Sequence, residues 1–111
     1  MTTLFLQQPH SLLLVRPACF GFNTQTSSSN AFQFQGEASR SLIQKMALAE
    51  FDQLIDDFNS KGILNLIVED TPVPEKPDAI FPNNWFTTHE DGKLILYPML
   101  ADNRRLERRS D

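Results

Sequence analysis

The chain has 111 residues, with ten lysine and arginine residues against fourteen aspartate and glutamate residues, a formal net charge of −4 and a pI near 5.0. This acidic balance argues against a nucleic-acid partner or an anionic membrane surface, because both need clustered positive charge. With 41% apolar and 22% charged residues, the composition is that of one globular domain rather than a disordered segment.

The first half of the chain predicts a strand, an irregular segment and a long helix. Ser11–Arg16 is a short apolar run that stops at Pro17, which fits a buried strand. Residues 18–36 are polar with four embedded phenylalanines, and we interpret them as a loop packed over the core. Over residues 37–61 apolar side chains recur at three- and four-residue steps, and Gly62 can take the left-handed position that ends a helix.

The second half predicts another strand and a hairpin. Residues 63–68 follow the helix at once as a strand, and a proline-rich loop occupies residues 71–77. Two β-rich runs, residues 84–89 and 93–98, flank Asp91 and Gly92. An Asp-Gly turn between such runs is a firm hairpin signal.

The last segment, residues 101–109, predicts the start of a helix with Asp102 or Asn103 as its N-cap. The chain stops at Asp111 without a cap or a closing strand, so we expect a longer protein that is cut inside this helix. The order strand, long loop, helix, strand predicts an α/β fold.

The segment PDAIFPNNW, residues 77–85, places one carboxylate and two amides on a rigid loop. Its prolines restrict the backbone around Asp78 and present Asn83 and Asn84 at the entrance to a strand. An ionised aspartate accepts bonds from a planar guanidinium or ureido group, and a rigid loop limits the entropy lost on binding. The alternative is that these three residues only make local turns, and composition does not decide between the two.

The segment NRRLERR, residues 103–109, places arginines at the start of the predicted helix. At helical spacing Arg104 and Arg108 share a face, and Glu107 lies three residues after Arg104. A cation is unfavourable at the positive end of the helix dipole, so Arg104 is a candidate for binding a substrate carboxylate. The alternative is a solvated basic face.

Other chemistry finds little support in the sequence. A Cys–His pair of Cys19 with His10 or His89 lacks any local signature, and a lone cysteine is commonly a small buried hydrophobe. No metal-ligand spacing, phosphate loop or nucleophile elbow is present. The sequence offers no second cysteine to pair with Cys19, no signal peptide and no stretch long enough to span a bilayer. We therefore expect a cytoplasmic location.

Read together, several segments resemble the start of the guanidino-group-modifying superfamily. The resemblance rests on residues 15–17, on PDAIFPNNW, on the hairpin at residues 89–92 and on residues 96–99 leading into NRRLERR. The amidinotransferase-like citrulline-utilisation hydrolases look closest, with dimethylarginine dimethylaminohydrolase and arginine deiminase as more distant relatives. The resemblance implies the pentein fold, a five-bladed α/β propeller. Residues 1–111 would form its N-terminal portion, about two blades of a truncated catalytic domain.

The resemblance also implies roles for the residues singled out above. Asp78 falls where family members place the carboxylate that grips guanidinium or ureido nitrogens. Asn84 falls where dimethylarginine hydrolases carry a second substrate-binding aspartate. A neutral amide there would either suit a neutral ureido group or relax the grip on a cation. Arg104 falls where those hydrolases bind the substrate α-carboxylate. Asn83 joins these three as a candidate substrate-binding residue, and residues 22–30 resemble a flap over the pocket.

In this superfamily a cysteine near the C-terminus attacks the central carbon and a mid-chain histidine moves the protons, with no metal or organic cofactor. Residues 1–111 contain none of those catalytic positions, and Cys19 and His89 stand at the wrong places in the order to replace them. We therefore expect the N-terminal part of a hydrolase of non-peptide carbon–nitrogen bonds in citrulline or arginine derivatives, inactive on its own.

The alternative is a non-catalytic α/β module that binds a small molecule or self-assembles. Two blades of a propeller leave unpaired strand edges and uncovered apolar faces, so the lone chain should form homo-oligomers or be marginally stable. A cooperative, monomeric unfolding of this chain would favour the stand-alone module.

Overall fold

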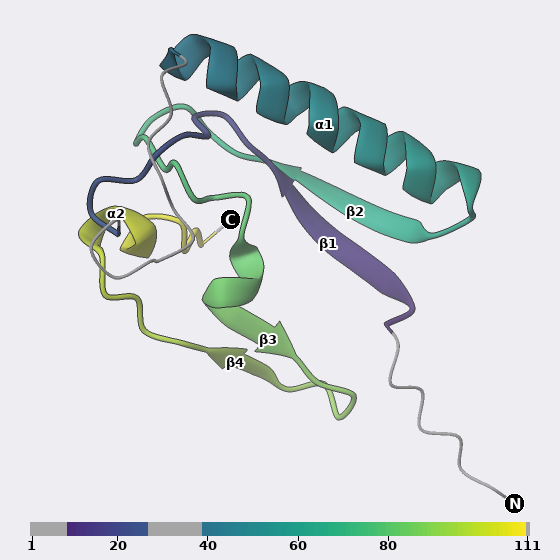
Figure 1. Cartoon of the computed structure of the whole chain (residues 1–111). Coiled ribbons are helices and arrows are strands. Elements are labelled where there is room, and N and C mark those ends of the chain that lie inside the picture. The colour runs from purple at the N-terminus through teal and green to yellow at the C-terminus, as the bar shows by residue number, and fades with distance from the viewer. Residues whose placement is uncertain (1–8, 27–38, 111) are drawn as a thin grey trace, which may run out of the picture.

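The computed structural model describes residues 9–26 and 39–110 and shows a mixed α/β fold (Figure 1), as the sequence predicts. Residues 27–30 of the expected flap and the expected first helical residues 37–38 lie outside the described part. The elements in chain order are β1 (Ser11–Arg16), α1 (Arg40–Ser60), β2 (Leu64–Glu69), the 3-10 helix η1 (Pro82–Asn84), β3 (Phe86–Thr88), β4 (Leu94–Leu96) and α2 (Asp102–Arg105).

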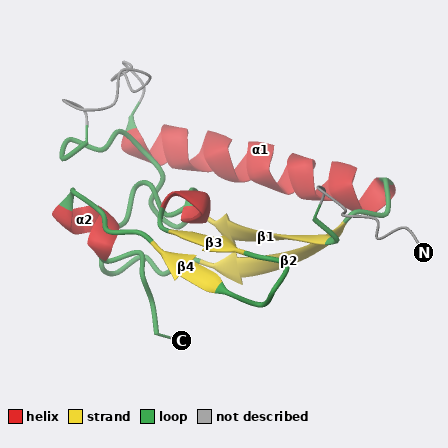
Figure 2. Cartoon of the chain, turned by 90° about the horizontal axis from the view of Figure 1, so that it is seen from below, coloured by secondary structure: helices red, strands yellow, loops and turns green. Residues whose placement is uncertain are grey.

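Strands β1 and β2 form a parallel pair joined through α1. Their register runs from Ser11 opposite Leu64 to Arg16 opposite Glu69. The helix α1 covers one face of this pair, and the β3–β4 hairpin lies on the other side of the strands from α1 (Figure 2). Because the strands are parallel, both carboxyl ends lie at the same edge, and the loops that leave them carry the polar groups described below.

The ends of α1 follow from local capping. The hydroxyl of Ser39 accepts the backbone N–H of Leu42 at 3.3 Å and caps α1, whose first residue is Arg40. At the other end Gly62 has φ +72° and Ile63 donates to the carbonyl of Phe58 at 2.9 Å, which confirms the left-handed glycine cap. Since Ile63 belongs to this cap, β2 begins one residue later than expected.

Strands β3 and β4 form the predicted antiparallel hairpin, with Phe86 opposite Leu96. Gly92 takes φ +85° in the turn and donates to the carbonyl of His89 at 3.0 Å. The expected start of the first strand at residue 84 is wrong, because Pro82 opens a 3-10 turn that still includes Asn84.

The expected helix over residues 101–109 is also wrong in extent, since α2 is a single turn, and neither Asp102 nor Asn103 caps it. Its N-cap is Ala101, whose side chain cannot accept a hydrogen bond. The backbone N–H of Asn103 instead donates to the side-chain carbonyl of Gln25 at 2.9 Å. The cap therefore comes from a loop 78 positions earlier in the sequence, which local patterns cannot show.

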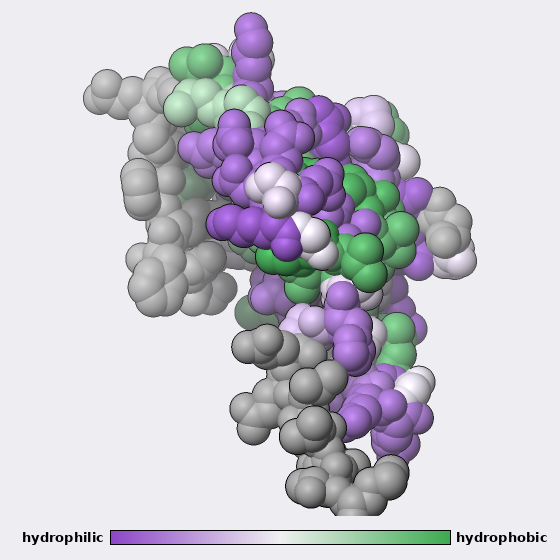
Figure 3. Space-filling model, turned by 90° about the vertical axis from the view of Figure 1, so that its right-hand side faces the viewer, coloured by the Kyte–Doolittle hydropathy of each residue, from purple (hydrophilic) through white to green (hydrophobic). Residues whose placement is uncertain are grey.

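Much apolar surface is left uncovered. The sheet face away from α1 exposes Leu64 by 68% and Leu66 by 60%, and apolar side chains reach the surface beside polar ones in Figure 3. Further along, Val15 contributes to the lining of a cavity of about 340 Å³ with Trp85 and Phe86, whose ring centroids are 4.6 Å apart. A two-stranded sheet is marginal alone, and the two-blade propeller portion stays a prediction.

Candidate functional site

The loop that carries the predicted site residues is folded by consecutive tight turns. Ala79 donates to the carbonyl of Lys76 at 3.2 Å, Phe81 to that of Asp78 at 3.0 Å, and Trp85 to that of Pro82 at 3.1 Å. These turns bond the amides of Ala79, Phe81 and Trp85 within the loop, and Asp78 lies inside it with only 9% of the residue exposed.

A buried ammonium group anchors the start of this loop. Lys76 is 1% exposed, and its Nζ lies 3.3 Å from Asp70 Oδ1 at the end of β2. The same Nζ donates to the carbonyls of Thr71 at 3.0 Å and Pro74 at 2.7 Å. Since a buried charge needs both a counter-ion and hydrogen bonds, this set of partners explains how Lys76 is tolerated in the interior.

The Asp78 carboxylate has one bonded and one open oxygen. Its Oδ2 accepts a hydrogen bond from Asn23 Nδ2 at 2.8 Å and lies 3.9 Å from Arg104 Nε. Among residues 9–26 and 39–110, no donor is bonded to Oδ1. A carboxylate oxygen held in this way can accept one more N–H group without any rearrangement.

Arg104 is the centre of the site. Its Nε and Nη2 each donate to the Glu107 carboxylate at 2.9 Å, in the forked arrangement that is strongest for this pair. Its Nη1 donates to Asn84 Oδ1 at 2.8 Å, and Nη2 also reaches the carbonyls of Asp78 at 3.4 Å and Phe81 at 3.3 Å. The second hydrogen of Nη1 has no acceptor within the described part of the chain.

Burial and charge oppose each other at Glu107. Burial raises the pKa of this carboxyl above its ordinary value, and the bonds from Arg104 act in the opposite direction. The neighbouring carboxylates of Asp78 and Asp70 add to the upward shift. The carboxylates of Asp70, Asp78 and Glu107 therefore lie close to the Arg104 guanidinium and the Lys76 ammonium.

The structure brings together three of the four residues proposed from the sequence. Asp78, Asn84 and Arg104 meet through the contacts of the Arg104 guanidinium. Asn83 is exposed and takes no part in the contacts described for this site. The alternative of a solvated basic face does not fit Arg104, because its side chain is 11% exposed and paired with Glu107.

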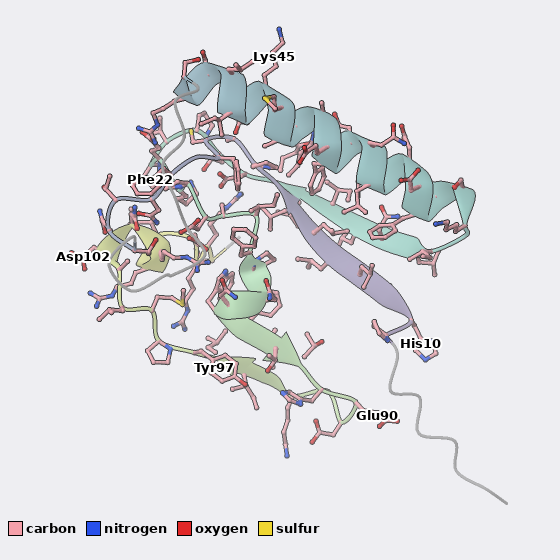
Figure 4. All side chains as sticks on the ribbon, viewed as in Figure 1. His10, Phe22, Lys45, Glu90, Tyr97 and Asp102 are labelled. Carbon is pink, nitrogen blue, oxygen red and sulfur yellow. The ribbon has the colours of Figure 1, made fainter. Side chains whose placement is uncertain are left out.

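Sequence reasoning gave no site role to Asn23, Asn103 or Glu107. The three-residue spacing of Glu107 from Arg104 was a usable signal for an ion pair. Asn23 belongs to the expected flap, residues 22–30, but no pattern gave this residue a role of its own; it comes to the site from a loop just after β1. Figure 4 shows the side chains of this loop, near Phe22, on the same side of the molecule as α2 with Asp102.

Cys19 has the features of a structural thiol. It is half-buried, its Sγ lies 3.6 Å from the carbonyl of Pro72, and burial raises the pKa of the thiol. A nucleophilic cysteine needs the opposite shift, because the thiolate is the attacking species. Within residues 9–26 and 39–110, no cluster of His, Cys, Asp and Glu suited to a metal ion is found, and no helix is long and apolar enough to cross a membrane.

A family comparison supplies the remaining observation. The model of the family "N,N dimethylarginine dimethylhydrolase, eukaryotic" matches residues 16–111, which include every residue of the site. The chain belongs to this family. Its members belong to the pentein superfamily, and the family name implies hydrolysis of guanidino compounds. No curated protein and no solved structure matches the chain.

The match therefore confirms the superfamily that the sequence motifs indicated. The matching family is one that we placed among the more distant relatives, and the citrulline-utilisation branch stays a prediction.

Proposed function

We propose that residues 1–111 supply the substrate-binding part of a hydrolase that cleaves non-peptide carbon–nitrogen bonds in guanidino or ureido amino acids. The proposal is carried by the Asp78 carboxylate, which is buried beside Arg104 and keeps Oδ1 open. Substrates of this class carry N–H groups at one end and an α-carboxylate at the other. A buried carboxylate and an arginine are the complementary groups.

Asp78 is proposed to accept N–H groups from the guanidinium or ureido end of the substrate through Oδ1. Because Oδ2 is already bonded to Asn23, the carboxylate is held in place before the substrate arrives. Such preorganisation limits the entropy cost of binding and favours one substrate orientation.

Arg104 is proposed to bind the substrate α-carboxylate through the second hydrogen of Nη1. The Glu107 fork occupies Nε and one side of Nη2, so Arg104 offers a single contact rather than a bidentate one. Most of the guanidinium therefore serves to hold the site together, and its removal affects stability as well as binding.

Asn84 favours a ureido substrate within this class. Its Oδ1 accepts from Arg104, so the side chain presents only the NH₂ donors of Nδ2. A ureido group carries a carbonyl oxygen that can accept such a donor, whereas a guanidinium carries none. Citrulline is thus the favoured substrate, and arginine or dimethylarginine are the other substrates to be tested. Asn83, which is exposed beside Asn84, remains a weaker candidate for contact with the same substrate.

The nucleophilic cysteine is proposed to lie outside residues 1–111. The raised pKa of Cys19 supports this, because a protonated thiol is a poor nucleophile. Without that cysteine, the described residues can bind and orient a substrate but provide no group that attacks its central carbon.

The test is a hydrolysis assay of the full-length protein with citrulline, arginine and dimethylarginine, followed by ammonia or amine release. We expect turnover of at least one of them, no turnover by residues 1–111 alone, and unchanged turnover in Cys19→Ser. Failure of the full-length protein on all three substrates contradicts the proposal. Turnover by residues 1–111 that is lost in Cys19→Ser contradicts the placement of the nucleophile.

A self-assembling module is a second candidate because of the exposed leucines of β2. Leu64 and Leu66 form an apolar strip on β2, whose outer edge pairs with no strand among residues 9–26 and 39–110. Sizing of residues 1–111 with and without Leu66→Lys separates the two functions. If the chain self-associates, has no substrate affinity and becomes monomeric in the variant, the module is favoured over the hydrolase.

A further inference from the structure

We propose that Asn23 is a positioning residue for Asp78, and that its pairing with Asn103 fastens the loop after β1 to α2. The inference rests on the proposed function, since it concerns the carboxylate that binds the substrate. It assigns a role to a residue that the sequence motifs and the family match leave without one.

The orientation of the Asn23 amide is fixed by its neighbours. The backbone N–H of Gln25 lies 3.0 Å from Oδ1 and can only donate, so this atom must be the carbonyl oxygen. The opposite atom, Nδ2, then faces Asp78 Oδ2 at 2.8 Å, where a donor is required. Asn23 is 1% exposed, so water does not compete for these bonds.

Asn23 and Asn103 form a reciprocal amide pair. Asn23 Nδ2 donates to Asn103 Oδ1 at 3.1 Å, and Asn103 Nδ2 donates to Asn23 Oδ1 at 2.8 Å. The neighbouring Gln25 side chain accepts the backbone N–H of Asn103 at 2.9 Å. A loop and a helical turn that lie 80 positions apart in the sequence are thereby joined at two adjacent points.

This arrangement fixes the orientation of the Asp78 carboxylate. The Asn23 donor holds Oδ2, and the carbonyl of Asp78 is held by Arg104 Nη2 at 3.4 Å and by the amide of Phe81 at 3.0 Å. Rotation of the carboxylate would break the bond to Asn23, so Oδ1 stays directed away from the amide pair. Without Asn23 the carboxylate could rotate toward Arg104, whose Nε is 3.9 Å from Oδ2, and close into an internal ion pair.

Asn23→Asp in the full-length protein tests this role. The side chain keeps its shape and its acceptor for Gln25 but loses the Nδ2 donor toward Asp78 and toward Asn103. The matched control is Asn59→Asp, since Asn59 also accepts an amide from another asparagine, Asn65, but on the exposed surface. With citrulline at about pH 8 we expect kcat/KM to fall about 10- to 100-fold in Asn23→Asp. Asn59→Asp should stay within about twofold of the parent.

The pH dependence separates positioning from a general loss of structure. A proton shared between two adjacent carboxylates can replace the missing amide hydrogen. Relative to the parent, Asn23→Asp should therefore recover activity as the pH falls toward about 5. A loss of the same size at both pH values, or no loss at all, overturns the inference.

A second readout does not depend on turnover. The NH₂ signals of the Asn23 side chain, identified in a ¹⁵N–¹H spectrum by their loss in Asn23→Asp, should shift in Asp78→Asn and stay in place in Asn59→Asp. If the parent hydrolyses none of the substrates but the signals shift, the proposed function fails and the Asn23–Asp78 contact stands. If the signals do not move in Asp78→Asn, the positioning role fails regardless of activity.

Discussion

The contrast between Arg104 and Arg105 provides a direct test of how the site is held together. Both are arginines of α2 with a carboxylate partner three residues away, Glu107 for Arg104 and Asp102 for Arg105. The side chain of Arg104 is 11% exposed and that of Glu107 2%, whereas Arg105 is 58% exposed and Asp102 85%. Arg104→Ala and Arg105→Ala therefore make matched substitutions in two different environments.

Loss of Arg104 leaves Glu107 buried without its forked partner and Asn84 without a donor. Removal of one member of a buried ion pair costs about 3–5 kcal/mol, while an exposed pair contributes about 0.2–1 kcal/mol. Arg104→Ala should therefore lower the free energy of unfolding by about 2–5 kcal/mol more than Arg105→Ala does.

The assay is urea unfolding of the full-length parent and both variants, followed by circular dichroism and analysed by linear extrapolation. In variants that remain folded, Arg104→Ala should also raise KM, through loss of the contact to the substrate carboxylate. Equal destabilisation by the two substitutions would refute the view that Arg104 anchors a buried network.

Three further predictions concern single groups. Because burial raises the pKa of Glu107, the folded state binds its proton more tightly than the unfolded state, so this carboxyl lowers stability as the pH rises above about 4.5. Glu107→Gln should remove that contribution. The free energy of unfolding of the parent minus that of Glu107→Gln should therefore fall between about pH 4 and pH 7, and a difference that does not fall contradicts this prediction. Lys76→Met should cost about 3–5 kcal/mol in urea unfolding, since it leaves Asp70 buried without its counter-ion; a cost below about 1 kcal/mol argues against a buried pair. Gly62→Ala should lower the free energy of unfolding by about 1 kcal/mol, because alanine is strained at the φ of +72°. An added Cβ meets no atom within 4 Å, so no steric clash adds to this cost. An unchanged Tm would show that the cap relaxes.

Elements with strong local signals could be predicted from the sequence. The Asp91-Gly92 turn identified the hairpin, and Gly62 identified the end of α1, because both positions need a left-handed backbone that glycine adopts readily. The apolar runs at residues 11–16 and 63–68 identified the two strands on either side of the helix, although not their parallel pairing. In each case the interactions that decide the structure lie within a few residues.

The errors have a local and a distant cause. The 3-10 turn at Pro82 displaces the expected strand start locally, whereas the short α2 is capped by Gln25, which lies 78 positions before Asn103. For the site, the motifs indicated Asp78 and Arg104, but the partners that orient them include Asn23 from a polar loop with no periodic pattern. Such contacts depend on how the chain folds back on itself, and a single sequence does not show them.

The central claim is that the Asp78 carboxylate binds the reacting end of a guanidino or ureido substrate. Its most direct test is kcat/KM of Asp78→Asn in the full-length protein, with Asp56→Asn on the exposed side of α1 as the control. The side chain keeps its shape and loses its charge, so we predict a fall of at least about 100-fold at unchanged Tm. A kcat/KM equal to that of the parent would contradict the account.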